Sequence, residues 1–370
     1  MMAQNVNKVV RVPAFVDIHV HFREPGFTEK EDISSGARAA AAGGYRAVCM
    51  MPNTNPAIDS PNILLDADLR GREARYETGV STFAASAMTL LQGGIELADY
   101  DAMDTTKTIC RELTGHGICG ISEDGKTLSD EAMMERVCEA AVRLDLPVMD
   151  HAEPEAEMIR RDIALAKKTG ARFHLQHVSL AESVGLIRAA KAEGVPVTCE
   201  TAPHYFALTM DAAREGRQGT NAKMNPPLRT ERDRMAVIEG LADGTIDCIA
   251  TDHAPHEAAA KALPFEKAAN GVIGLETAFP VAFTALVKSG ILRLEDLVRL
   301  MSTRPAEIIG LGPADDDYAE LDLDAEWEID PDKFLSKGRN TPFAGMRVFG
   351  SVIKTVVGGR IVYEKTDRMR

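Results

Sequence analysis

The sequence predicts an α/β protein folded as a (β/α)8 barrel, in which eight parallel strands close into a ring surrounded by helices. Eight short apolar or β-branched runs alternate along the chain with alanine-rich amphipathic stretches of helical periodicity. Several of these stretches end at a glycine just before the next run, as at Gly115, Gly170 and Gly194, where a helix C-cap belongs. Eight such units fit a closed barrel more simply than an open doubly wound sheet, which is the alternative.

The predicted strands are residues 9–18, 45–51, 80–85, 117–122, 147–150, 172–177, 196–201 and 246–251. The predicted helices are residues 33–42, 60–77, 100–113, 129–144, 155–168, 180–193, 231–242, 273–288 and 294–309. The segment 257–272, between the eighth strand and the next helix, lies where a lid over the site is expected.

The C-terminal part of the chain breaks the alternation. We assign residues 9–312 to the barrel and residues 313–370 to a tail that packs on it. In the tail, two strand-like runs at 347–357 and 360–364 flank Gly358 and Gly359, which predicts a β-hairpin. Because only about eight residues precede the first run, a small β subdomain is expected to come from the tail alone.

Composition and charge exclude several classes of protein. The 370 residues are 45% hydrophobic and carry 42 Lys and Arg against 56 Asp and Glu, a net charge of −14. Such a surface repels nucleic-acid phosphates and anionic lipid. No apolar stretch approaches the length of a spanning helix, and residues 1–7 lack the apolar core of a secretory signal.

Cysteine usage predicts a reduced, cytoplasmic protein. None of the six cysteines forms a CxxC pair, so neither a cysteine-ligated zinc site nor a disulfide framework is expected. The six are Cys49, Cys110, Cys119, Cys138, Cys199 and Cys248.

Histidines and carboxylates gather at the C-terminal ends of the predicted strands, where barrel enzymes place their active sites. His19 and His21 are two residues apart in an extended run, so both side chains point to one face and can bind a single ion. Four further candidate ligands follow other strands: Asp124, His151, His177 and Asp252. Imidazole and carboxylate ligands without thiolates suit catalytic zinc. Because six ligands exceed the needs of one tetrahedral ion, one or two Zn²⁺ are expected, with two bridged by a carboxylate and a hydroxide.

Longer motifs make the chain resemble the dihydroorotases of the amidohydrolase superfamily, almost from end to end. The motifs are FVDIHVHFREPG at 15–26, MPNT at 51–54, NPPLR at 225–229, ATDHAPH at 250–256 and GLET at 274–277. The resemblance implies zinc-dependent, reversible cyclisation of N-carbamoyl-L-aspartate to L-dihydroorotate.

The resemblance also implies roles for single residues. His19, His21 and Asp252 would hold one metal, His151 and His177 the other, and Asp124 would bridge them. Asp252 would in addition carry the proton to the departing ring nitrogen. Arg23, Asn53 and His256 would bind the substrate carboxylate. Asn225 and the backbone near Gly274 would contact the ring amides. The strand before Asp124 has no lysine at 117–121, so a carbamate bridge is not expected.

Two other functions remain open. Another cyclic amidase, such as a hydantoinase or allantoinase, would not need the cation Arg23 for an uncharged substrate. A non-catalytic partner of another pyrimidine enzyme would be expected to lack metal ligands, and none of the six is lost. A homo-oligomer is expected, and association with aspartate carbamoyltransferase, as in some family members, is left open. Glu200 and His204 follow the seventh run and could support the ligands or hold an extra metal.

Overall fold

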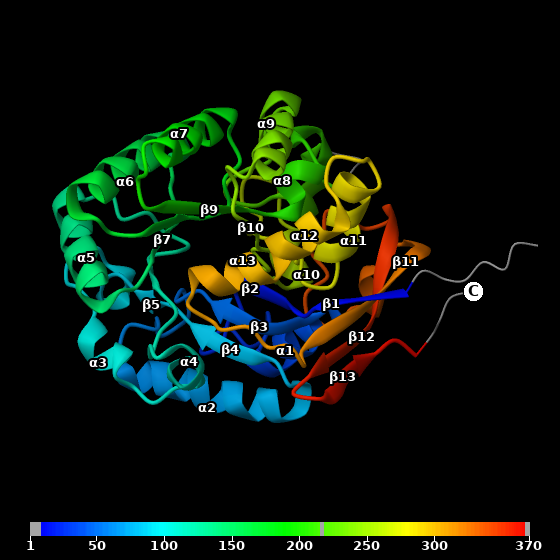
Figure 1. Ribbon diagram of the computed structural model, residues 1–370, viewed down its shortest axis with the longest axis horizontal. Helices are drawn as coiled ribbons and strands as arrows, with labels where there is room; N and C mark the ends of the chain where they lie inside the picture. The colour runs from blue at the N-terminus through cyan, green and yellow to red at the C-terminus, as the bar shows by residue number, and fades with distance from the viewer. Residues whose placement is uncertain (1–8, 215–217, 367–370) are drawn as a thin grey trace, which may run out of the picture.

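The computed structural model describes residues 9–214 and 218–366, and its centre is a ring of short parallel strands inside a ring of helices (Figure 1). The stretch 1–7, judged above for a signal sequence, lies outside the described residues. The barrel strands are β2 (Phe15–Val20), β3 (Tyr45–Met50), β4 (Ser81–Ala84), β5 (Ser86–Ala87), β6 (Ile121–Ser122), β7 (Val148–Asp150), β8 (Phe173–Leu175), β9 (Val197–Thr201) and β10 (Cys248–Ile249).

Hydrogen bonds close these strands into a barrel. They form two parallel sheets, β2-β3-β4 and β5-β6-β7-β8-β9-β10. One junction is continuous along the chain, since β4 and β5 are parted by a single residue and count as one of the eight barrel strands. At the other junction Val20 bridges to His253 in parallel, and the His21 amide donates to the His253 carbonyl at 2.8 Å. The predicted (β/α)8 barrel is therefore confirmed.

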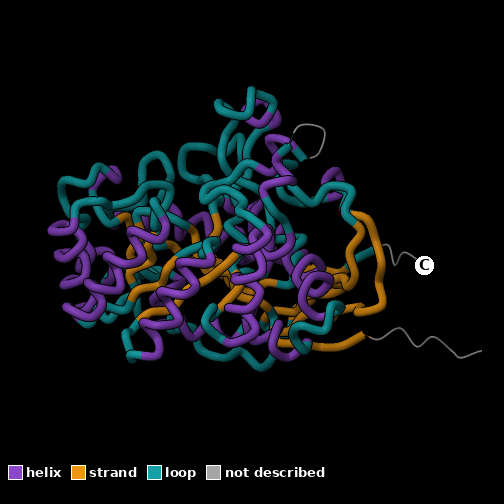
Figure 2. The backbone as a smooth tube through the Cα atoms, turned by 90° about the horizontal axis from the view of Figure 1, so that it is seen from above, coloured by secondary structure: helices purple, strands orange, loops and turns teal. Residues whose placement is uncertain are grey.

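The outer layer consists of helices between successive strands, and Figure 2 shows them around the strands with long loops along one edge. They are α1 (Ile33–Ala42), α2 (Pro61–Thr78), α3 (Tyr100–Asp104), α4 (Ile109–Thr114), α5 (Glu131–Leu144), α6 (Glu155–Thr169), α7 (Ala181–Ala192), α8 (Pro203–Ala207), α9 (Glu231–Asp243), α10 (Ala258–Lys261), α11 (Ala278–Ala282), α12 (Leu294–Met301) and α13 (Thr303–Ile308). Four 3-10 turns, η1 (Leu90–Gln92), η2 (Met210–Ala213), η3 (Gly219–Ala222) and η5 (Pro331–Lys333), and the π-helical turn η4 (Phe283–Val287) complete them.

Local sequence explains where several helices begin and end. Asp32 caps α1 by accepting a hydrogen bond from the Ser35 amide, and Thr230 caps α9 in the same way through Asp233. Gly115 and Gly170 end α4 and α6 in the left-handed conformation, as the sequence predicts. None of the described helices combines the length and the apolar character needed to span a membrane.

Several predicted segments were wrong in extent. The helix expected at 294–309 is divided at Ser302 into α12 and α13, and the strand expected at 117–122 is only Ile121–Ser122. The helix expected at 100–113 is two helices, because Thr108 caps a new one by accepting from the Arg111 amide. The helix expected at 273–288 begins only at Ala278 and continues as the π-helical turn η4. The strand expected at 9–18 is divided, and its first part, β1 (Val9–Pro13), leaves the barrel.

A small antiparallel sheet lies beside the barrel in the order β1-β11-β12-β13. Its other strands are β11 (Tyr318–Glu328), β12 (Arg347–Val357) and β13 (Arg360–Glu364). Val9 pairs with Asp322 in register, so the tail does not build this sheet alone. The hairpin predicted at Gly358 and Gly359 is present between β12 and β13. The assignment of residues 9–312 to one domain stays a prediction, although β1 belongs to the small sheet.

The barrel interior is apolar below the rim, and it contains a disulfide that the sequence did not predict. Val16, Ile18 and Phe83 pack there with the cysteines of neighbouring strands. Cys49 and Cys119 are joined by a disulfide, with Cα atoms 6.9 Å apart, so the expectation of free thiols was wrong for this pair. Cys49 is in β3 and Cys119 lies just before β6, and one strand separates β3 from β6 in the barrel. Side chains of alternate strands share an interior layer. Seventy residues of sequence separation hide this proximity.

The tail is hydrogen-bonded to the barrel at Glu276. The Glu276 carboxylate accepts hydrogen bonds from the Leu335 and Ser336 amides at 2.9 and 3.0 Å. Burial raises the pKa of Glu276 to about 7, although these two amides oppose the shift. The folded chain therefore holds a proton on Glu276 over a pH range in which the unfolded chain releases it.

This carboxylate predicts a pH-dependent loss of stability. The raised pKa makes the Glu276 contribution to the unfolding free energy fall between its ordinary value of 4.5 and about 7. Glu276→Gln removes this contribution, so from pH 6 to pH 8 the variant should gain about 1 kcal/mol relative to the wild type. Urea denaturation of both proteins at several pH values measures the difference. The exposed Glu328→Gln is the control, and a pH-independent difference for Glu276→Gln would contradict the prediction.

Candidate metal centre and active site

The carboxyl ends of the barrel strands deliver the predicted residues to one rim. His19 is in β2 and His21 follows it, while Asp124, His151 and His177 come after β6, β7 and β8. Arg23, His177 and Asp252 have positive φ angles of 63°, 37° and 48°. Such angles are uncommon outside glycine and concentrate at functional sites, where the chain must turn sharply to aim a side chain.

A cavity of about 210 Å³ opens at this rim and contains most of the predicted site. Its lining consists of His21, Arg23, Asn53, Asp124, Gly125, His151, His177, Asn225, Asp252, Ala254, His256, Asn270 and Gly271. Of the predicted residues, His19 lies beneath the cavity floor, where it is fully buried. Gly274 is not part of the lining either, because its amide faces the His253 ring at 3.2 Å.

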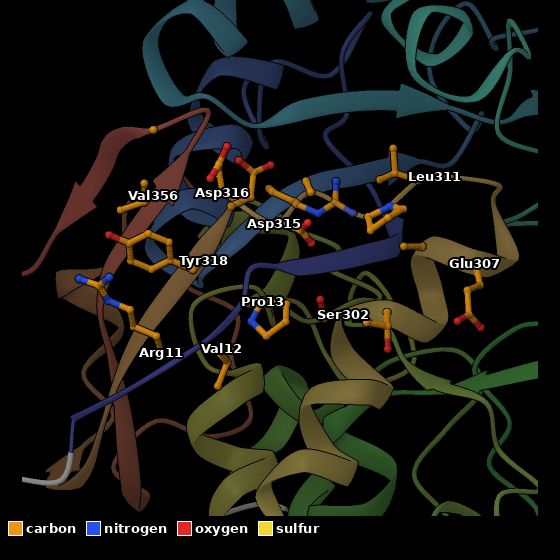
Figure 3. A pocket seen from close by; sticks show the side chains of 17 residues that line it. Arg11, Val12, Pro13, Ser302, Glu307, Leu311, Asp315, Asp316, Tyr318 and Val356 are labelled. Carbon is orange, nitrogen blue, oxygen red and sulfur yellow. The ribbon is translucent and has the colours of Figure 1, made fainter.

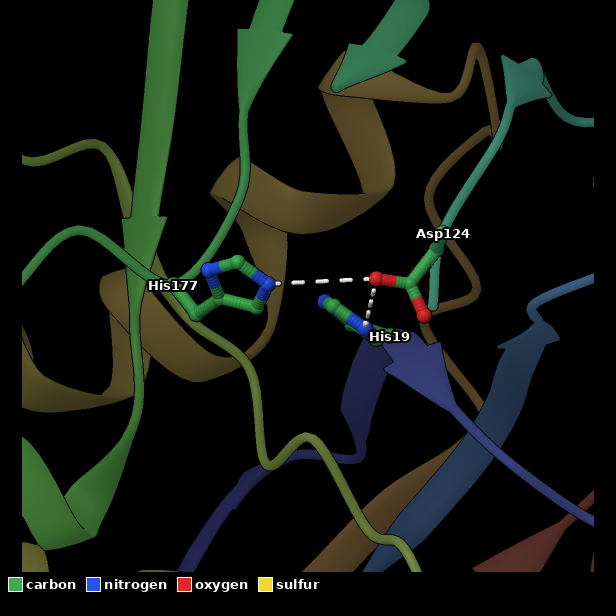
Figure 4. Close-up of side chains that lie close together, drawn as sticks. All are labelled: His19, Asp124 and His177. Carbon is green, nitrogen blue, oxygen red and sulfur yellow. Dashed lines mark ion pairs between the residues drawn. The ribbon is translucent and has the colours of Figure 1, made fainter. Parts of the chain in front are cut away.

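Asp124 lies at the middle of the cluster and only 2% of it is exposed. Its Oδ1 is 3.0 Å from His151 Nδ1, 3.6 Å from His19 Nε2 and 3.8 Å from His177 Nε2. Figure 4 shows His19 and His177 converging on this carboxylate from separate strands. Its Oδ2 is 3.3 Å from His21 Nε2, so four imidazoles surround one carboxyl group.

The second carboxylate, Asp252, faces the histidine pair of the first strand. Its Oδ1 is 3.0 Å from His21 Nε2 and 3.6 Å from His19 Nε2. Ligand atoms of these three residues lie within 4.8 Å of one another, and so do those of His19, Asp124 and His177. The predicted set for one metal is thus brought together, and Asp124 lies between it and His151 and His177.

Burial and nearby charge have opposite effects on the pKa values of the cluster. Burial alone would lower the pKa of His19, but Asp124 and Glu200 raise it well above its ordinary value. Burial would raise the pKa of Asp124, but His19 and His21 hold it well below. Each group therefore favours its charged form only because opposite charge is close.

Unpartnered nitrogen atoms indicate that the cluster fits metal ions. Among the described residues, the buried His19 Nε2 and His177 Nδ1 have no hydrogen-bond partner. His177 Nε2 is only 2.7 Å from His151 Nδ1, and two imidazole lone pairs at that distance repel unless a proton or cation lies between them. Buried polar atoms are normally satisfied, so these nitrogens are suited to ligate zinc or a similar ion.

Residues behind the cluster fix the orientation of its imidazoles. Glu200 Oε1 accepts from His19 Nδ1 at 2.6 Å, which leaves His19 Nε2 free to bind a cation. Asn53 Oδ1 lies 2.9 Å from His21 Nδ1 and does the same for that ring. A third group of potential ligands, His174, Glu200 and Cys248, lies behind His19, but Glu200 already bonds the His174 ring at 3.1 Å. We therefore assign Glu200 to the support of His19 rather than to a separate metal.

The remaining histidines take other positions. His204 is buried, and burial lowers its pKa to about 4, so it is neutral at physiological pH. His253 points away from the cavity, with its Nε2 3.4 Å from Glu31 and its Nδ1 facing the Gly274 amide.

Arg23, His256 and Asn53 line the same cavity beside the cluster. Arg23 donates to the Pro255 carbonyl at 3.3 Å, and its Nη2 is 3.4 Å from His256 Nε2. His256 Nε2 also lies 2.7 Å from the Asn270 carbonyl, which can only accept. Burial first and Arg23 second lower the pKa of His256 to about 3. Asn53 packs closely against Gly125, which has a φ of +85°. A Cβ at position 125 would come within 2.6 Å of the Asn53 amide nitrogen, so a glycine leaves room there.

Sequence reasoning missed Asn270, Gly271, Gly125 and Ala254 in the lining. Ala254 and Gly125 lie inside motifs already singled out, so the cavity could have been extended to them. Asn270 and Gly271 lie in the segment 257–272, which the sequence marked only by its position.

Cavity size alone does not identify the site. A larger cavity, of about 830 Å³, lies where the small sheet meets α13, near the start of β2 (Figure 3). Pro13, Ser302, Glu307 and Tyr318 are among its lining residues. It lies at the amino-terminal end of the barrel strands, the face that barrel proteins use for stability rather than chemistry.

Comparison with known proteins agrees with this geometry. The model of the amidohydrolase family matches residues 10–362. The chain belongs to the amidohydrolase family.

Curated relatives within this family are similar over nearly the whole chain. A protein of Desulforapulum autotrophicum named dihydroorotase is 44% identical over 399 residues, covering 98% of this chain and 88% of its own length. A dihydroorotase of Anaeromyxobacter dehalogenans is 43% identical, covering 96% of this chain and 87% of its own. Among solved structures, L-hydantoinase from Arthrobacter aurescens matches with a TM-score of 0.85 at 26% identity, covering 96% of this chain and 86% of that one.

The support of His19 by Glu200 yields a prediction about metal affinity. Glu200→Gln replaces a charged acceptor by a weaker one, so His19 becomes less basic and less firmly oriented. We expect zinc affinity to fall about 10- to 100-fold. Competition titration against a chelator measures it. Asp247→Asn, which removes another buried carboxylate away from the ligands, is the control. Equal affinity in the wild type and Glu200→Gln would contradict the role.

Proposed function

We propose that this amidohydrolase is a dihydroorotase, which interconverts N-carbamoyl-L-aspartate and L-dihydroorotate in pyrimidine biosynthesis. The observation that carries the proposal is the guanidinium of Arg23, which shares one cavity of about 210 Å³ with the histidine–carboxylate cluster. A cavity lined by both a cluster for amide chemistry and a cation suits a cyclic amide that bears a carboxylate. The relatives named dihydroorotase, at 40–44% identity, support the same substrate.

Zinc is the metal that this donor set favours. Histidine and carboxylate ligands at an open site are those of catalytic zinc, which supplies Lewis acidity to a carbonyl and lowers the pKa of water. We propose that His19, His21 and Asp252 hold one ion, and that His151 and His177 hold a second. Asp124 lies between the two sets and would bridge them.

Arg23, Asn53 and His256 would bind the substrate carboxylate. Burial lowers the pKa of Arg23 to about 10, so its guanidinium remains charged at neutral pH and presents forked donors. The Asn53 amide nitrogen and the His256 ring complete the carboxylate site. Asn225 is placed for the ring amide, since its Nδ2 lies 3.1 Å from His151 Nε2 beside the cluster. Gly274, away from the cavity, could act there only through His253.

Asp252 is placed to move the proton. In the hydrolytic direction, water adds to the ring carbonyl, the C–N bond breaks, and the departing nitrogen needs a proton. Asp252, 6% exposed and lining the cavity, would take a proton from the attacking water and deliver it to that nitrogen. In the biosynthetic direction the same carboxylate would remove the proton from the ureido nitrogen as the ring closes.

We also propose a homo-oligomer and association with aspartate carbamoyltransferase, for which the support is the family resemblance. A cytoplasmic location rests on four buried, free cysteines, Cys110, Cys138, Cys199 and Cys248. Size-exclusion chromatography with an activity assay on each fraction tests whether the chain is active without a partner.

An assay of three substrates tests the function. The purified chain, with and without added zinc, should open L-dihydroorotate in a zinc-dependent manner and leave hydantoin and allantoin nearly untouched. Turnover of hydantoin in preference to dihydroorotate would instead make the chain a hydantoinase and overturn the proposal.

Arg23 provides the sharper test of substrate recognition. Arg23→Met removes the cation but keeps much of the side-chain volume, so kcat/KM for dihydroorotate should fall on the order of 10²–10³-fold. Arg188→Met, at an exposed ion pair with Asp243, is the control and should leave kcat/KM unchanged. A loss smaller than about threefold in Arg23→Met would contradict the assignment of Arg23 to the carboxylate.

A further inference from the structure

Two buried polar side chains outside the motifs hold the wall of the active site that carries His256 and Asn270. Lys261, in α10, is 4% exposed, and Asn340, in the tail, is 3% exposed. Neither touches the metal cluster or lines the cavity. Both are hydrogen-bonded to backbone groups of the segments that do line it, and their contacts converge on the Gly271 carbonyl oxygen.

Lys261 directs its three ammonium protons at three backbone carbonyls. Nζ lies 3.1 Å from the Lys223 oxygen, 2.9 Å from the Ala269 oxygen and 3.0 Å from the Gly271 oxygen. The last two carbonyls flank Asn270, and Lys223 lies two residues before Asn225. An ammonium group has three donors and no acceptor, so these contacts satisfy it completely. Burial, and then Lys223, lowers its pKa to about 8.

Asn340 ties the same wall to the tail. Its Oδ1 accepts from the His256 amide at 3.0 Å, and its Nδ2 donates to the Ala254 and Gly271 carbonyls, each at 3.0 Å. Its own carbonyl accepts from the Ile273 amide. The backbones are already close there, because a Cβ on Gly271 would lie 2.8 Å from the Ala254 oxygen. One side chain thus fixes the spacing between the strand-end segment 254–256 and the segment 271–273.

These contacts matter because they determine where His256 lies. The Asn270 carbonyl, which receives the His256 ring nitrogen, lies between two carbonyls bound by Lys261. The His256 backbone is held by Asn340. A shift of this wall would move His256 relative to Arg23, which follows the neighbouring strand β2.

We propose that Lys261 and Asn340 form a rim clamp that sets the position of the substrate-carboxylate wall, so that substrate affinity depends on a residue of the C-terminal tail. Both are positioning residues, since neither touches the substrate. This inference rests on the proposed function for the identity of the carboxylate, while the geometry of the wall is independent of it.

Kinetics of two variants test the rim clamp. Asn340→Asp keeps the acceptor for the His256 amide and places a carboxylate oxygen against two carbonyls. Lys261→Gln keeps two of the three N–H donors and is milder, in case the first variant folds poorly. We expect KM for L-dihydroorotate to rise at least about tenfold in each, with kcat within about threefold and zinc content unchanged. Thr355→Val is the matched control, because it also removes a buried tail-to-barrel hydrogen bond, to the Ala41 carbonyl.

The KM of the double variant shows whether Lys261 and Asn340 act on the same wall or independently of each other. If both residues act on one wall, Asn340→Asp combined with Lys261→Gln should raise KM less than the product of the single effects. A KM unchanged in both zinc-loaded single variants, or a double variant that equals the full product, would overturn the proposal.

Hydrogen exchange keeps the test independent of the substrate. Amides in 254–258 and 268–273 should exchange at least about tenfold faster in each single variant, while amides around His19 and His177 remain as in the wild type. Unchanged exchange in the first two segments would overturn the clamp. If the wild type fails to turn over dihydroorotate but exchange rises as expected, the proposed function fails and the clamp stands.

Discussion

A buried carboxylate inside a ring of imidazoles is the constraint around which this molecule is organised. Asp124 is 2% exposed and lies within 3.0–3.8 Å of nitrogen atoms from His19, His21, His151 and His177. A buried charge is costly unless it is paired, so the position of each histidine matters to the stability of the whole rim. The barrel meets this constraint because the carboxyl ends of its strands converge on a single small area.

Support for the cluster comes from progressively more distant parts of the chain. Glu200 on β9 and Asn53 after β3 orient the two imidazoles of the first strand. The tail contributes to the rim from outside the barrel, through the Glu276 contacts with Leu335 and Ser336 and through Asn340. The tail is therefore part of the active-site architecture as well as a cover for one side of the barrel.

Much of the fold and most of the site could be predicted from the sequence, because both depend on local patterns. Alternating apolar runs and helices specify a barrel, and the two-residue spacing of His19 and His21 places both on one face. Segments at strand ends supplied Asp124 and Asp252, and also Arg23, Asn53 and His256. These features are legible because neighbouring residues determine them.

The features that escaped prediction depend on contacts between distant segments. β1 joins the small sheet because Val9 pairs with Asp322, more than 300 residues along the chain. Cys49 and Cys119 meet only through the layering of the barrel interior. Lys261 and Asn340 resemble ordinary polar residues of a loop and a tail, and their burial follows from how those segments fold over the rim. Gly274 was assigned to the cavity from a motif, but the intervening ring of His253 separates it.

The most direct test of the central claim is to locate the metal. Crystals of the zinc-loaded chain, measured on both sides of the zinc absorption edge, would show the ions by their anomalous scattering. We expect peaks on either side of Asp124, one about 2.0–2.2 Å from ligand atoms of His19, His21 and Asp252 and the other at the same distance from His151 and His177. A zinc-loaded chain with no anomalous peak at these residues, or with its zinc elsewhere, would contradict the account.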